Sequence, residues 1–185
     1  MTNGISISNI FDWYLTEIMP VVEKYAIQSK NGYHGLYTHT AAVVFRGIDY
    51  ALALGQDTTG VVLACAFHDM ARTHDCDDLE HGINAIPLAN CVMDDIGNID
   101  ANVRDAIIFA IKNHSLNIPA PDYISQCMWD ADRTRLSWEC GYYPKFFATE
   151  RAKVVAAGTP KLYLEFMHKN MSPDAEKIVE LGENY

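Results

Sequence analysis

Apolar side chains recur along this chain at intervals of three and four residues, the spacing that places them on one face of an α-helix. This pattern predicts helices over residues 10–27, 39–54, 57–70, 79–96, 100–113 and 123–135, and shorter ones over 149–157, 161–168 and 173–181. Pro20 lies within the first of these and predicts a kink or a break there. No segment alternates in the manner of a strand, so we expect an all-α fold.

The segment 57–70 is almost wholly apolar in its middle, VVLACAF, which is typical of a helix buried at the centre of a bundle. At 185 residues, the chain has the length of one domain with a single substantial core. We therefore expect one domain over residues 1–185.

Metal-binding side chains interrupt the apolar faces of five successive predicted helices. They are His39, the adjacent pair His68-Asp69, His81, His114 and Asp130. A single histidine on an apolar face is more often a core residue bonded to a carbonyl than a metal ligand. Here, however, four of the seven histidines follow this placement, together with two aspartates. Since such groups are costly to bury unless paired or ligated, the pattern predicts a shared metal ion.

Mixed imidazole and carboxylate ligands suit a divalent transition metal, namely Fe, Mn, Co, Ni or Zn, whereas Mg or Ca prefers oxygen ligands alone. A structural zinc site is usually a closed set rich in cysteine, and the five cysteines do not cluster with these histidines. The composition therefore predicts a catalytic ion with open coordination positions.

Charge limits the possible partners. Fourteen basic and 24 acidic residues give a net charge of -10, which disfavours binding to nucleic-acid polymers and to anionic membranes. The cysteines form no C-x-x-C pair, the N-terminus MTNGISIS lacks the basic and apolar regions of a signal peptide, and no apolar run reaches a membrane span. We expect a cytoplasmic protein with a small-molecule substrate.

The order His39, then His68-Asp69 in FHDMAR, then Asp130 in WDADR resembles the motif of the HD-domain superfamily of metal-dependent phosphohydrolases. The resemblance covers residues 33–149 and implies a compact multi-helix bundle, with the remaining helices packed on it. It also implies that these four residues bind one metal ion, and that Asp69 bridges to a second ion where one exists.

Two further histidines, His81 in EHG and His114 in KNHS, resemble the additional histidines of binuclear members of that superfamily. The resemblance therefore implies a two-metal site, with a single ion as the alternative. The residues after the HD pair depart from the pattern of many relatives, since Met70 and Ala71 stand where lysine and glycine are common. This departure bears on the substrate class more than on metal binding.

The resemblance implies hydrolysis of a small phosphate ester, such as a phosphomonoester, a phosphodiester or a nucleotide, by a water molecule that the metal activates. Asp69 and Arg72 are the catalytic candidates, and Arg72 is the guanidinium best placed to contact phosphoryl oxygens. Lys112 and Arg133 are further candidates for substrate binding, and His74 is a candidate proton shuttle. The alternative for either arginine is an ordinary ion pair.

Two other functions fit the same residues. The six-ligand pattern also resembles the di-iron oxygenases of the superfamily, such as myo-inositol oxygenase. The third possibility is a regulatory module that binds a ligand at the metal pocket without turnover. The hydrolase is favoured by analogy, because the resemblance is mostly to hydrolases.

Overall fold

The computed structural model describes residues 6–74, 78, 80–140 and 143–158, with the backbone alone over 135–140. Its helices are α1 (Ile7–Trp13), α2 (Met19–Tyr25), α3 (Ala41–Ala53), α4 (Thr59–Phe67), α5 (His81–Ile96), α6 (Ala101–Asn113), α7 (Tyr123–Cys140) and a last helix over 150–158. Two π-helical turns, η1 (Tyr14–Ile18) and η2 (Leu36–Thr40), and the 3-10 turn η3 (Pro144–Phe146) complete the set. The described residues contain no strand, so the predicted all-α class is confirmed. The helices predicted over 161–168 and 173–181 lie outside the described residues.

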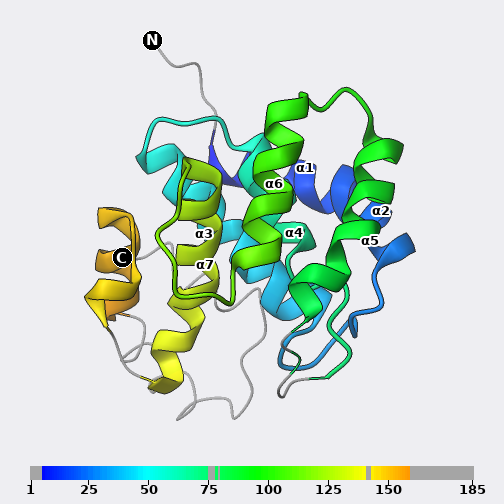
Figure 1. The fold of residues 1–185 in the computed structure, drawn as a ribbon. Helices are drawn as coiled ribbons and strands as arrows, with labels where there is room; N and C mark the ends of the chain where they lie inside the picture. The colour runs from blue at the N-terminus through cyan, green and yellow to red at the C-terminus, as the bar shows by residue number, and fades with distance from the viewer. Residues whose placement is uncertain (1–5, 75–77, 79, 141–142, 159–185) are drawn as a thin grey trace.

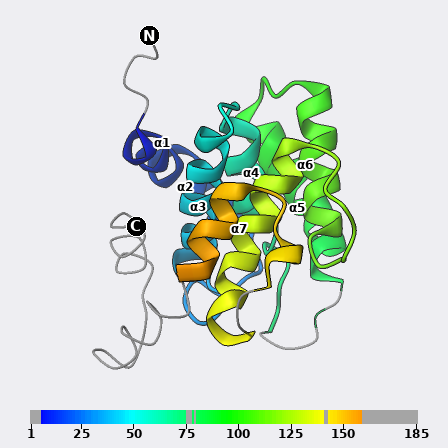
Figure 2. The ribbon, with the colours of Figure 1, turned by 90° about the vertical axis from the view of Figure 1, so that its left-hand side faces the viewer.

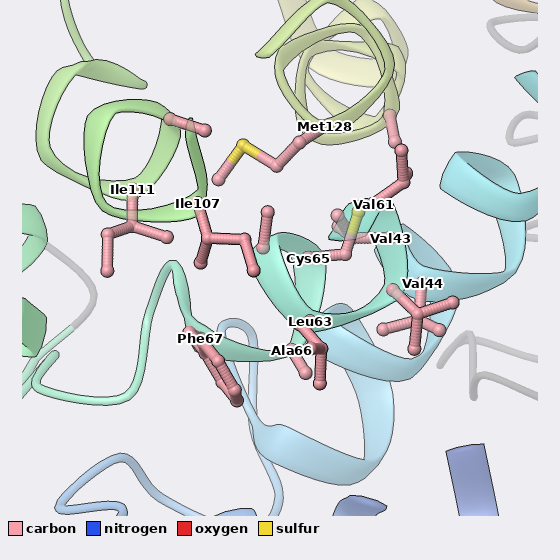
Figure 3. Packing of buried hydrophobic residues seen from close by; sticks show 14 of the residues in the cluster. Val43, Val44, Val61, Leu63, Cys65, Ala66, Phe67, Ile107, Ile111 and Met128 are labelled. Carbon is pink, nitrogen blue, oxygen red and sulfur yellow. The ribbon is translucent and has the colours of Figure 1, made fainter. Parts of the chain in front are cut away.

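Helix α4 is the centre of the bundle, as its apolar sequence predicts. It packs against α3, α6 and α7 (Figure 1), and its residues from Gly60 to Phe67 are all buried. Figure 3 shows Ile107 and Ile111 of α6 and Met128 of α7 around this helix. His68 and Asp69 directly follow α4. They lie in the interior because α4 is enclosed on several sides.

The predicted interruption at Pro20 is present as a change of helix type. The π turn η1 separates α1 from α2, and Pro20 lies in the first turn of α2. A proline has no N–H to donate to the preceding turn, so the α-helical ladder is interrupted where this residue enters. The buried side chains of Tyr14 and Ile18 still hold the segment on the core.

The last described helix, over residues 150–158, closes the bundle on the side of α3 and α7. Thr149 caps it, because its hydroxyl accepts a hydrogen bond from the Ala152 amide at 3.2 Å. Arg151 forms an ion pair with Asp49 of α3 at 2.7 Å, and Figure 2 shows the helix (orange) lying along α7. None of the described helices has the length and apolar character needed to cross a lipid bilayer.

Gly82, the second residue of α5, allows α5 to approach α6 closely. A methyl group there would lie 2.5 Å from the carbonyl oxygen of Ile111 and 3.1 Å from Cε1 of His114. We therefore expect Gly82→Ala to force the two helices apart and to lower the free energy of unfolding by about 1–3 kcal/mol. Urea denaturation measures this loss. Gly158→Ala is the matched control, since its added methyl has no described atom within 4 Å, and equal stability of Gly82→Ala and the wild type would contradict the packing.

Candidate metal centre

The pair His68-Asp69 lies in a turn at the end of α4. The predicted helix over 57–70 ends earlier, at Phe67, although the His68 amide still donates to the Ala64 carbonyl at 3.2 Å. The Arg72 amide then donates to the Asp69 carbonyl at 2.9 Å, which closes a tight turn. This turn places the side chains of Asp69 and Arg72 side by side, with the Asp69 side chain only 1% exposed.

One oxygen of Asp69, Oδ2, faces three imidazoles. It lies 3.2 Å from Nδ1 of His34, 3.5 Å from Nε2 of His39 and 3.4 Å from Nε2 of His68. Asp132 adds a second carboxylate, with Oδ1 3.2 Å from Nε2 of His39 and 3.9 Å from Nε2 of His68. We call these five residues the first cluster. It contains two overlapping groups of possible metal ligands, His34, His39 and Asp69 in one and His39, His68 and Asp132 in the other.

The other oxygen of Asp69, Oδ1, faces a separate group. It lies 3.2 Å from Nε2 of His81 and 4.0 Å from Nε2 of His114, and these two nitrogens are 2.7 Å apart. We call Asp69, His81 and His114 the second cluster. The Arg72 guanidinium also lies here, and its Nε donates to Asp69 Oδ1 at 2.9 Å. Asp69 is thus shared between the two clusters.

The two histidines that precede α3 come from irregular backbone. His39 lies on the π turn η2, a helix type found often at functional sites. His34 lies in the preceding loop, which is anchored because the amides of Ile27 and Gln28 both donate to the Met70 carbonyl at 2.8 and 3.1 Å. The Gln28 side-chain amide also donates to the His34 carbonyl. These bonds bring His34 to the residue that follows the HD pair.

Three of the imidazoles have their orientation fixed by backbone carbonyls three residues earlier. Nδ1 of His68 bonds to the Cys65 carbonyl at 2.7 Å, and Nδ1 of His114 bonds to the Ile111 carbonyl at 2.7 Å. Nδ1 of His81 bonds to the Asp78 carbonyl in the same way. Since Nδ1 must carry the proton to donate to a carbonyl, the Nε2 atom of each ring turns inward as the metal-binding nitrogen.

These atoms fit a cation. Nε2 of His39 is 3.1 Å from Nε2 of His68 and also close to the carboxylates of Asp69 and Asp132, and a single proton cannot bridge all of these acceptors. Within the described part of the chain, the buried Nδ1 of His39 has no hydrogen-bond partner. Electron-rich atoms that face one another in a buried space repel unless a positive group lies among them. The first cluster therefore has the donor set of a site for a divalent transition metal.

Burial and the carboxylates of Asp69 and Asp132 determine which of the imidazoles are protonated. Burial lowers the pKa of His39 to about 4 and that of His114 to about 4. Burial also disfavours the charged form of His68, but the Asp69 and Asp132 carboxylates outweigh it and raise the pKa of His68 to about 9. In the metal-free protein, His68 thus holds a proton at neutral pH and His39 does not.

Asp130, which the sequence predicted as a ligand, is not brought to this group. Its carboxylate is buried, but it accepts hydrogen bonds from the backbone amides of Ala148 at 2.9 Å and Thr149 at 2.7 Å. Burial raises the pKa of Asp130, although these amides act against the rise. Asp130 and Asp132 are two positions apart on α7 and so point to different sides of the helix. Asp132 is the carboxylate of α7 that faces the imidazoles, and Asp130 holds the segment before the last described helix.

The four residues predicted to bind substrate do not lie together in the structure. Arg72 lies in the second cluster, where its Nη2 is 2.9 Å from Nε2 of His81. Arg133 instead donates to the carbonyls of Phe146 and Leu116, at 2.9 and 3.1 Å. Lys112 and His74 are both exposed. Of the four candidates, Arg72 is the one that the structure brings to the imidazoles, while His34 and Asp132 are members that the sequence did not assign to the ligand set.

One solved crystal structure has a fold similar to that of this chain. The crystal structure at 1.45 Å resolution of a predicted HD superfamily hydrolase from an uncultured Thermotogales bacterium is similar, with a TM-score of 0.67. The match covers 90% of this chain and 98% of that chain, at 20% sequence identity. The chain shares the fold of this predicted HD superfamily hydrolase. No family model matches the sequence, and no curated protein matches it. The fold implied by the sequence resemblance is thereby confirmed.

The different surroundings of the two aspartates on α7 lead to opposite predictions. We expect Asp132→Ala to lower metal affinity by about 10- to 100-fold or more. In the metal-free protein it removes the attraction of this carboxylate to the His39 and His68 imidazoles but leaves no backbone amide without an acceptor. We expect Asp130→Ala to leave the buried Thr149 amide and the more exposed Ala148 amide without this acceptor and to lower the free energy of unfolding by about 1–3 kcal/mol, with metal binding retained by the folded fraction. Calorimetric titration with Mn²⁺ and urea denaturation measure the two effects. Asp105→Ala, on the exposed side of α6, is the control, and a loss of metal binding in Asp130→Ala alone would contradict the assignment.

The raised pKa of His68 predicts how metal binding depends on pH. Since His68 has a pKa of about 9 in the metal-free protein, an ion that ligates its Nε2 must displace a proton at pH 7. The apparent affinity for Mn²⁺ should therefore rise about tenfold for each pH unit between pH 6.5 and 8.5, as release of one proton requires. Titration in buffers of different ionisation enthalpy counts the released protons. An affinity that is independent of pH over this range would contradict the assignment of His68 as a ligand.

Proposed function

We propose that this protein is a metal-dependent hydrolase of small phosphate esters. The observation that carries the proposal is a buried carboxylate, Asp69, with an imidazole cluster on each of its two oxygens and a guanidinium against one of them. Carboxylate and imidazole ligands hold a transition metal, and a guanidinium beside them recognises the oxygens of a phosphoryl group. The similarity in fold to a predicted HD superfamily hydrolase supports a hydrolase in general.

The first cluster would hold the ion through His39, His68, Asp69 and Asp132, with Fe, Mn, Co, Ni or Zn as the candidate metals. When bound, such an ion lowers the pKa of a water molecule that it holds and neutralises negative charge on the phosphoryl oxygens. The Nδ1 bond from His68 to the Cys65 carbonyl keeps that ring oriented before any substrate arrives. The chain thus contributes a preorganised ligand set rather than one that forms on binding.

Three members of the site are partly exposed and are therefore the ones that a substrate can contact. The side chains of His34, Arg72 and Asp132 are 15%, 14% and 19% exposed, whereas those of His39 and His68 are 1% exposed. In this proposal, the Arg72 guanidinium contacts the phosphate ester and orients its oxygens. His34, beside Asp69 Oδ2, is placed to pass a proton to the leaving oxygen.

The proposed substrates are small phosphate esters, such as a phosphomonoester, a phosphodiester or a nucleotide. The net charge of -10 disfavours nucleic-acid polymers, and the cytoplasmic location predicted from the sequence is part of the proposal. A di-iron oxygenase is the second candidate, because two clusters share Asp69 as a bridging carboxylate would. The Arg72 guanidinium in the second cluster favours the hydrolase over the oxygenase. A module that binds a ligand without turnover is the third candidate.

Activity assays with metal-free protein reloaded with Mn, Co, Fe, Ni or Zn test this proposal. We expect turnover of at least one of a panel of phosphomonoesters, phosphodiesters and nucleotides, and a loss of about 100-fold or more in His68→Ala, because a ligand is removed. Asp105→Ala is the control and should keep full activity. Oxygen consumption by the iron-loaded protein would favour the oxygenase instead. Full activity of His68→Ala would refute the hydrolase assignment.

A further inference from the structure

Arg72 is placed among groups that would otherwise bind a second ion. Its Nε donates to Asp69 Oδ1 at 2.9 Å, and its Nη2 lies 2.9 Å from Nε2 of His81. Asp69 Oδ1 and His81 Nε2, together with Nε2 of His114, are the ligand atoms of the second cluster. The guanidinium therefore contacts two of the three atoms that a metal ion in this cluster would use.

A guanidinium and a metal ion compete for these atoms. Nδ1 of His81 bonds to the Asp78 carbonyl, so Nε2 carries one lone pair, and that lone pair accepts the hydrogen bond from Arg72. An ion ligated by an imidazole sits about 2.0–2.1 Å from the nitrogen, along that same lone pair. The nitrogen cannot serve both partners at once.

Charge leads to the same conclusion. The second cluster offers one carboxylate, shared with the first cluster, and two imidazoles. The Arg72 guanidinium already neutralises Asp69 on its Oδ1 side. A divalent ion added beside a retained guanidinium would bring like charges within a few ångströms of each other in a buried space, where repulsion is weakly screened.

We propose that Arg72 takes the place of a second metal ion, so that the protein binds a single divalent ion, in the first cluster. This inference rests on the proposed function in taking a metal as the ligand of the first cluster, and it fixes the number of ions there. Arg72 thus supplies the second positive charge of the site from the protein itself.

Counting bound ions tests this inference in the full chain. Metal-free protein is titrated with Mn²⁺ in a calorimeter, and the dialysed product is measured by elemental analysis. We expect one ion per chain in the wild type and two in Arg72→Ala, because the alanine leaves both lone pairs free. The double variant Arg72→Ala/His81→Ala should return to one ion. Arg104→Ala is the matched control, since it removes one positive charge from a surface ion pair with Asp94 and should keep one ion.

Two ions per chain in the wild type would overturn the proposal, as would a single ion in both Arg72→Ala and Arg72→Gln when circular dichroism shows them folded. If neither variant folds, anomalous diffraction from wild-type crystals soaked in Mn²⁺ decides the question. One peak in the first cluster supports the proposal, and a peak bound by His81 and His114 overturns it. The count does not depend on turnover, so failure of every phosphate ester as a substrate would refute the proposed function and leave this result standing.

Discussion

The site depends on one buried carboxylate. Asp69 directs one oxygen to the imidazoles of His34, His39 and His68, and the other to His81 and to the Arg72 guanidinium. A carboxylate that is 1% exposed is stable as an anion only if positive or hydrogen-bonding groups surround it. The imidazoles and the Arg72 guanidinium meet that requirement for Asp69, and a bound cation would meet it for Asp69 and Asp132 together.

The fold meets this requirement by placing Asp69 directly after its most apolar helix. Since α4 is enclosed by α3, α6 and α7, its C-terminal end lies where the surrounding helices can contribute side chains. His68, His81 and His114 each bond to a carbonyl three residues earlier, so each orientation is fixed locally, at the end of a helix or at its start. The packing of the helices against one another then brings these three oriented imidazoles together.

The sequence was sufficient for the core helices that the structure describes and for the burial of the candidate ligands that lie on a single apolar face. Helical spacing correctly selected His39, His81 and His114 as inward-facing groups. It failed on α7, because that helix is buried on more than one side. Asp130 follows Cys127, but Asp132 follows Ser125 and Met128, which are also buried, so spacing alone cannot tell which aspartate faces the imidazoles. The series from Ser125 to Asp132 was the signal that could have identified it.

His34 was missed for a different reason. It lies in a loop, where no periodicity reports burial, and it reaches Asp69 because the amides of Ile27 and Gln28 bond to the Met70 carbonyl. These hydrogen bonds join backbone atoms that are about forty residues apart in the sequence, and the pattern of apolar and polar side chains does not predict them. The clustering of a turn histidine with the HD pair is therefore information that the tertiary structure adds.

A crystal structure of the protein soaked with Co²⁺, with data collected at the cobalt absorption edge, tests the central claim most directly. The account predicts an anomalous peak within bonding distance of Nε2 of His39 and His68 and of the Asp132 carboxylate, with Asp69 beside it. A peak bound by Asp130, or cobalt found only at surface residues, would contradict it.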